Sequence, residues 1–110
     1  MATVFKNVLS TGLGTSQTTV LTTSGSATTT VIGLSLTNIT ESIIQISVQL
    51  NDTVASTTAY FVKNVTIPPN NSVRLINGGE RLVLGPSTTV KINSNADSSV
   101  DSVISYVEIS

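Results

Sequence analysis

The sequence predicts an all-β protein, a single-domain antiparallel β-sandwich. Three observations support this fold class. Apolar residues alternate with polar ones along most of the chain, which is typical of half-buried strands. Turn residues interrupt the pattern roughly every 8–12 residues, a spacing typical of sandwiches and barrels. Serine and threonine make up roughly three residues in ten, and no segment shows the spacing of an amphipathic helix.

The N-terminal third contains three predicted strands. Residues 3–9 form the first predicted strand, which ends at a loop that holds two glycines. A short strand over residues 18–22 ends at Ser24-Gly25-Ser26, a cluster of turn formers. A longer strand follows over residues 28–38. Its alternation places one set of side chains toward the core, namely Ile32, Leu34 and Leu36.

The middle of the chain gives the clearest strand pattern. Residues 43–51 form a predicted strand that alternates between apolar and polar from Ile44 onward, which indicates one buried face made of Ile44, Ile46, Val48 and Leu50. Residues 57–67 form the next predicted strand. It ends at Pro68 and Pro69, because proline lacks the amide proton that a strand ladder requires.

The C-terminal third is predicted to contain a hairpin. Asn77-Gly78 lies between the apolar runs 73–76 and 81–84, and Asn-Gly is the strongest short hairpin signal because both residues tolerate positive φ. Residues 90–93 and 100–109 complete a set of about nine short strands.

The expected architecture is one domain over residues 1–110. A jelly-roll or Ig-like sandwich fits the strand number, and a barrel is the alternative. Residues 1–5 could form a short N-terminal arm that adds a strand to a neighbour's sheet.

The composition argues against an enzyme. The chain has no histidine and no cysteine, the residues most used for proton transfer and thiol chemistry, and six scattered acids. We expect no cofactor. Five separated basic residues and a net charge of −1 argue against nucleic-acid binding, and no apolar run is long enough to cross a membrane.

One segment resembles a calcium loop, and it is a weak candidate. Oxygen-bearing side chains recur at alternate positions, and the candidate ligands are Asn93, Asn95, Asp97 and Asp101. Ser98 stands where a glycine is expected, and Ile104 replaces the closing acid. An Asx-rich hairpin turn whose side chains bond their own backbone is the favoured interpretation of this segment, so we expect no bound metal.

Two strands carry apolar residues on both faces, which indicates contact with another subunit. In a simple sandwich one of these faces would meet water, unless loops cover it. The low charge leaves few residues to protect sheet edges, which favours a homo-oligomer. The candidate interface residues are Tyr60, Phe61, Val62, Ile104 and Tyr106, with core packing as the alternative for the aromatic ones.

The chain as a whole resembles small virion structural proteins of tailed bacteriophages, especially cyanophages and marine phages. The segments that carry this resemblance are residues 1–7, 30–36, 59–68, 79–84 and 103–109. The resemblance implies a β-sandwich subunit of a virion, most simply a capsid cement or decoration protein that forms a trimer and binds the major capsid protein or another virion protein. A neck or tail component is the first alternative, and a carbohydrate-binding adhesin module is the second.

Overall fold

The computed structural model describes residues 3–109, without the side chains of residues 77–80. The described chain contains eight strands and no helix, so no helix in it could span a membrane. The strands are β1 (Thr3–Leu13), β2 (Thr18–Thr22), β3 (Thr28–Asn38), β4 (Ile44–Asp52), β5 (Thr57–Ile67), β6 (Ser72–Leu84), β7 (Thr88–Ser94) and β8 (Val100–Ile109). The predicted all-β fold class is confirmed.

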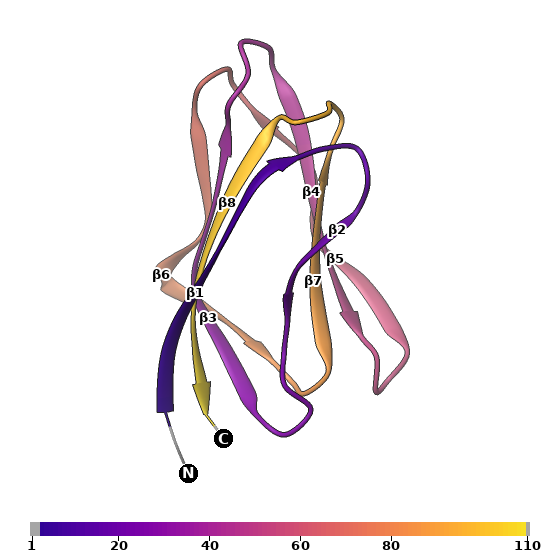
Figure 1. Ribbon diagram of the computed structural model, residues 1–110, viewed down its shortest axis with the longest axis vertical. Helices are drawn as coiled ribbons and strands as arrows, with labels where there is room; N and C mark the ends of the chain where they lie inside the picture. Colours follow the sequence, from indigo (N-terminus) through magenta and orange to yellow (C-terminus); the bar gives the residue numbers. More distant parts are fainter. Residues whose placement is uncertain (1–2, 110) are drawn as a thin grey trace.

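The strands form two four-stranded sheets that pack face to face (Figure 1). The first sheet has the order β1-β8-β3-β6, and the second has the order β2-β7-β4-β5. Every pairing is antiparallel. Only β4 and β5 follow each other within a sheet, and every other connection crosses between the sheets. This order is that of a jelly roll, so the Ig-like and barrel alternatives are set aside.

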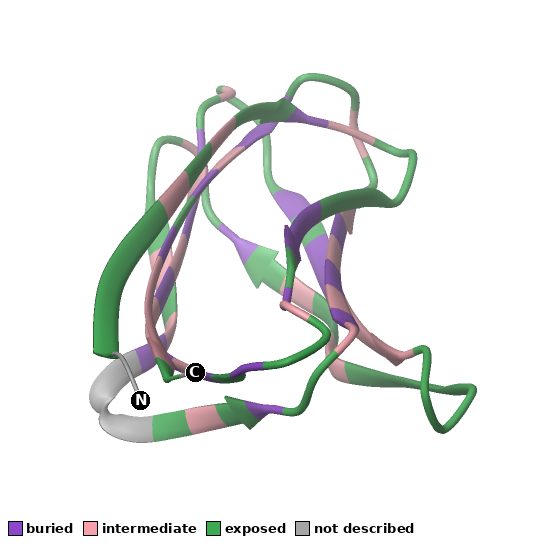
Figure 2. Cartoon of the chain, turned by 60° about the horizontal axis from the view of Figure 1, so that its bottom comes forward, coloured by how far each residue is buried: buried purple, intermediate pink, exposed green. Residues whose placement is uncertain are grey.

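The core lies between the two sheets and is made of aliphatic side chains. As predicted, Ile44, Ile46 and Val48 of β4 are buried, and Leu50 packs against them at the margin. Figure 2 shows that the buried residues lie mainly in the strands, while most loop residues are exposed. Burial of these side chains is the main stabilising contribution, since each is worth roughly 1.5–3 kcal/mol.

The predicted hairpin at residues 77–80 is wrong. Val73 pairs with Leu36 of β3, and Leu82 pairs with Val31 of the same strand, so both apolar runs belong to β6. The register of β6 against β3 shifts between these two pairs. The turn-forming sequence therefore lies within an interrupted strand, because both of its flanks find partners on β3.

The predicted facing of Ile32 is also wrong. Val31 and Leu34 are both buried, whereas Ile32 between them is half-buried and lines hollows on the outer face of the first sheet. The pairing of β3 with β8 shifts between Val31 and Gly33, which marks a β-bulge. An extra residue in a strand reverses the faces of the residues that follow it.

The described part of the predicted N-terminal arm is not free. Thr3, Val4 and Phe5 pair with Ile109, Glu108 and Val107 of β8, so β1 is an edge strand of the first sheet. Residues 1 and 2 lie outside the described chain. Both ends of the described chain lie at the same end of the sandwich (Figure 1).

Candidate assembly surfaces

The predicted interface residues do not form one patch. Tyr60, Phe61 and Val62 belong to β5, an edge of the second sheet, whereas Ile104 and Tyr106 belong to β8 in the first sheet. Ile104 is only 1% exposed and is part of the core, so no partner can reach it. The prediction of Ile104 as an interface residue is therefore wrong. Its side chain points toward the core, as do those of Val8 and Leu34, which lie directly opposite it on β1 and β3.

The three aromatic candidates differ in exposure. Tyr60 is 47% exposed, and the Lys63 ammonium nitrogen lies 5.0 Å from the centre of its ring, within range of a cation–π interaction. Phe61 and Tyr106 are half-buried and pack against the core. Tyr60 is therefore accessible to a partner, while Phe61 and Tyr106 contribute mainly to packing within the chain.

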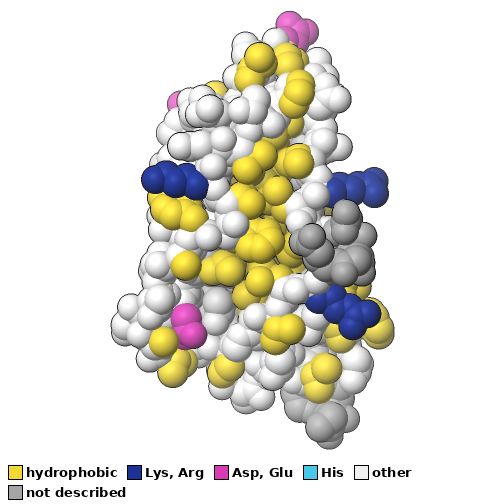
Figure 3. Space-filling model, turned by 180° about the vertical axis from the view of Figure 1, so that it is seen from behind, with side chains coloured by type: hydrophobic (Ala, Val, Ile, Leu, Met, Phe, Trp, Pro, Cys, Tyr) yellow, Lys and Arg dark blue, Asp and Glu magenta, His cyan; other side chains and the backbone are white. Residues whose placement is uncertain are grey.

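The side of the molecule that carries β5 and β6 shows a band of hydrophobic side chains. Figure 3 shows this band along the long axis, with Lys and Arg side chains on both borders. β5 and β6 are the outermost strands of the two sheets on this side. Their half-buried apolar residues are Phe61, Val62, Val65, Val73, Leu75 and Leu82.

The outer face of the first sheet is a second apolar surface, which the sequence predicts only in part. Phe5 and Leu9 of β1 lie opposite Val107 and Val103 of β8, so these four side chains share one face. Phe5 is 75% exposed and Leu9 is 70% exposed. Loops of the described chain leave this face open. The strand predicted over residues 3–9 includes Phe5 and Leu9, but a valine precedes each of them, so the sequence pattern does not show which of the two neighbours points outward.

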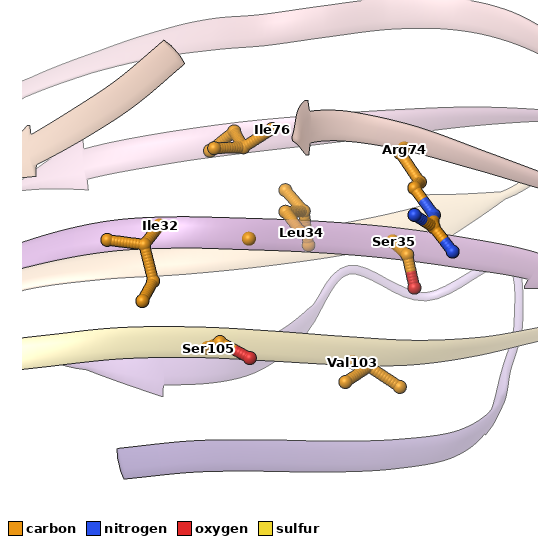
Figure 4. A pocket seen from close by; sticks show the side chains of 8 residues that line it. Ile32, Leu34, Ser35, Arg74, Ile76, Val103 and Ser105 are labelled. Atoms are coloured by element: carbon orange, nitrogen blue, oxygen red, sulfur yellow. The ribbon is translucent and has the colours of Figure 1, made fainter. Parts of the chain in front are cut away.

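A shallow hollow of about 320 Å³ lies in the middle of this face, around Gly33. Figure 4 shows Ile32, Ser35, Arg74, Val103 and Ser105 around it. Gly33 lacks a side chain there, and Ser35 and Ser105 are small, which makes the centre of the face lower than its rim. Arg74 lies on the same side as Ser35, to which it is paired across β3 and β6. The lining of this hollow therefore combines apolar side chains with the cation of Arg74.

The calcium candidates instead hold neighbouring segments of the chain together. Asp101 Oδ1 accepts hydrogen bonds from Thr11 Oγ1 at 2.8 Å and from the Gly12 amide at 3.0 Å. Asp97 Oδ1 accepts one from Thr15 Oγ1. The Asn95 Oδ1 atom accepts one from the Gln45 amide. The described residues contain no group of three or more acidic, cysteine or histidine side chains suited to a metal.

Adding calcium is therefore expected to leave the thermal unfolding of the chain unchanged. The side-chain oxygens of Asn95, Asp97 and Asp101 already accept hydrogen bonds from other segments of the chain. A cation could bind these oxygens only by displacing those hydrogen bonds. Differential scanning calorimetry in millimolar calcium and in EDTA checks this. A melting temperature that rises with calcium, and that loses the rise in the Asp97→Asn variant, would contradict it.

No protein-family model matches the sequence, and no curated protein matches it. One solved structure does match the fold, a chain from the crystal structure of the T13 viral particle of IBDV. The similarity is one of fold. The match has a TM-score of 0.57 and 11% sequence identity, and it covers 97% of this chain. This chain corresponds to 31% of the length of the IBDV chain, so the similarity concerns a jelly-roll unit of a longer protein.

Proposed function

We propose that this chain is a non-enzymatic structural protein of a virion, and that it acts as a capsid cement or decoration protein of a tailed bacteriophage. The observation that carries the proposal is the jelly-roll strand order, matched over nearly the whole chain by a chain of an icosahedral viral particle. Jelly rolls of this order are frequent in viral capsids. The tailed-phage assignment is supported by the resemblance of the sequence to small virion proteins of such phages.

The proposed mechanism is burial of the outer face of the first sheet against the major capsid protein or another virion protein. Four strands spaced by about 4.8 Å, each about 36 Å long, give a face of roughly 700 Å². Specific interfaces bury about 800 Å² on each partner, so this one face is nearly sufficient. Arg74 and Arg81, both on β6, give the rim a positive charge that suits a partner surface with carboxylates.

Self-association is part of the same proposal, with a trimer as the expected form. The low net charge permits close contacts between copies, and Tyr60 on β5 gives an accessible aromatic side chain for such a contact. In a trimer, the β5 and β6 side of one copy would contact a different surface of the next.

Cryo-electron microscopy of an intact particle that contains this chain tests the proposal. A cement protein is expected in many copies over the head shell, with the outer face of its first sheet against the capsid. A single small ring at the neck or tail would favour the first alternative. Jelly rolls also occur in lectins, so specific glycan binding by a chain absent from purified particles would favour the adhesin alternative.

A further inference from the structure

The free edge of β1 differs from the other three sheet edges. β2 is only five residues long, and short edge strands pair poorly with other chains. β5 is interrupted by two register shifts and by Asn64 at a φ of 56°. The fourth edge, β6, shifts register against β3 between Val31 and Gly33 and carries two arginines. Bulges and charges of this kind block edge pairing.

β1 has none of these protections between Thr3 and Ser10. This stretch pairs with β8 in an unbroken register, and the first irregularity follows Ser10. Lys6 is its only charged residue, and the Lys6 ammonium nitrogen lies 3.4 Å from Glu108 Oε1 in an ion pair within the chain. Figure 2 shows the strand exposed along this stretch at the border of the molecule. An edge of this kind is a template for another strand.

We propose that the β1 edges of two copies pair with each other, antiparallel, about a twofold axis at Asn7. In this register Phe5 of one copy lies opposite Leu9 of the other, and the same pair occurs twice because of the symmetry. Phe5 and Leu9 are among the most exposed apolar side chains of the chain, and both lie on the outer face of the first sheet. Directly opposed aromatic and aliphatic side chains stabilise antiparallel strand pairs.

The neighbouring registers are less favourable. A twofold axis at Lys6 would place the two lysines directly opposite each other, and like charges in that position destabilise a strand pair. An axis at Val8 would place Phe5 opposite Thr11 and Leu9 opposite Asn7, so neither apolar side chain would meet another. Only the axis at Asn7 pairs Phe5 with Leu9 and separates the lysines.

The paired edge spans about eight residues, or roughly 26 Å at the usual rise of a strand. Contacts of this size fall at the low end for specific complexes, so the contact is expected to be weak in dilute solution and strengthened by high local concentration on a particle. This contact rests on the proposed structural role and adds to it one surface, the β1 edge, through which copies of the chain associate. In a trimer formed through another surface, it would join two trimers.

Cysteine cross-linking tests the register directly, because the natural chain has no cysteine. The Asn7→Cys variant places its two thiols at the axis, where Cα atoms of opposed residues lie roughly 4.5–5.5 Å apart, within the range of a disulfide. We expect a covalent dimer under mild oxidation, formed at least about ten-fold faster than in the Thr3→Cys control, whose two thiols would lie far apart. The Val4→Cys, Ser10→Cys double variant should also cross-link, because these positions face each other about the same axis and both lie in the unbroken stretch of β1.

A second variant tests the contact without a disulfide. Asn7→Lys would oppose two lysines at the axis, and sedimentation analysis at high protein concentration should show less self-association than in the matched control Gln45→Lys, at an exposed position of β4, which is not an edge strand. Equal cross-linking of Asn7→Cys and Thr3→Cys, or equal sedimentation of the two lysine variants, would overturn the contact. A different result is that Asn7→Lys no longer binds particles while Asn7→Cys forms no cross-link. The β1 edge would then pair with a strand of a capsid protein, so the proposed contact between copies would be wrong while the virion role would stand.

Discussion

Replacing Asn38 with aspartate is expected to lower the free energy of unfolding by about 3 kcal/mol or more, from the loss of several buried hydrogen bonds. Asn38 is fully buried at the end of β3. Its Nδ2 atom donates to the carbonyl oxygens of Ser42, Ile67 and Pro68, at 2.7, 3.1 and 3.1 Å. The side chain thereby joins the β3–β4 loop to the end of β5 and the turn that follows it.

The aspartate variant would turn those three interactions from attractive to repulsive. Its oxygen would face three carbonyl oxygens, while only the bonds that Oδ1 accepts from the Thr40 amide and hydroxyl would remain. Burial among carbonyls would raise the pKa of the new carboxyl group, so the folded variant would bind its proton more tightly than the unfolded chain. The destabilisation is therefore expected to grow as the pH rises through that raised pKa, and to be smaller in acid.

Thermal unfolding across a range of pH values, monitored by circular dichroism, measures this effect. For a domain of this size, 3 kcal/mol corresponds to a fall in melting temperature of roughly 10–15 °C. Asn95→Asp is the matched control, because Asn95 is exposed and uses only its Oδ1 atom, as an acceptor from the Gln45 amide. Equal melting temperatures for the two aspartate variants would show that the Asn38 bonds do not stabilise the fold.

Most strands were predictable because their signals are local. Thr18–Thr22, Thr28–Asn38, Thr57–Ile67 and Val100–Ile109 are observed with the predicted bounds. Alternation and the turn residues at the ends of these segments determine both the strands and their limits. The strand order was not predictable from local signals, because it depends on which segments meet across the two sheets. The sequence therefore leaves jelly-roll, Ig-like and barrel arrangements open.

The failures occur where pairing with a distant strand overrides a local preference. The Asn77-Gly78 signal predicts a hairpin, but both flanking runs pair with β3, and the chain continues as β6. The facing of Ile32 depends on a bulge in β3 that alternation cannot show. These are tertiary effects, since strand formation depends on the neighbouring strands as much as on the segment itself.

The exposed apolar face of the first sheet was also predictable only in part, because it too depends on strand irregularities that the sequence does not show. Apolar residues on both faces of β8 correctly indicated an outward face that this chain does not cover, because Val103 is 43% exposed. The sequence could not say which of Val103 and Ile104 points outward, since both are β-branched aliphatic residues. β1 also has a bulge at Thr11 and Gly12, directly before the buried Leu13, and Gly12 has a φ of 65°. The apolar and polar pattern of the sequence does not predict this bulge.

Truncation of Ile104 and truncation of its neighbour Val103 are expected to change the free energy of unfolding by very different amounts. Ile104→Ala is expected to lower the free energy of unfolding by about 2–5 kcal/mol, because it removes a fully buried side chain and leaves a cavity between the sheets. Val103→Ala, one residue away on the outer face, is expected to change it by about 0.5 kcal/mol or less. Chemical denaturation of the two variants, with unchanged m-values, gives both numbers.

The same two variants separate folding from assembly. If the outer face of the first sheet is an assembly surface, Val103→Ala should weaken attachment to the particle while leaving unfolding nearly unaffected, because it removes apolar area only from that face. Ile104→Ala should lower stability while leaving attachment by the folded fraction intact. Attachment is measured by cosedimentation with particles at a temperature well below both unfolding transitions. A Val103→Ala variant that loses as much stability as Ile104→Ala would mean that the outer face is covered by this chain itself.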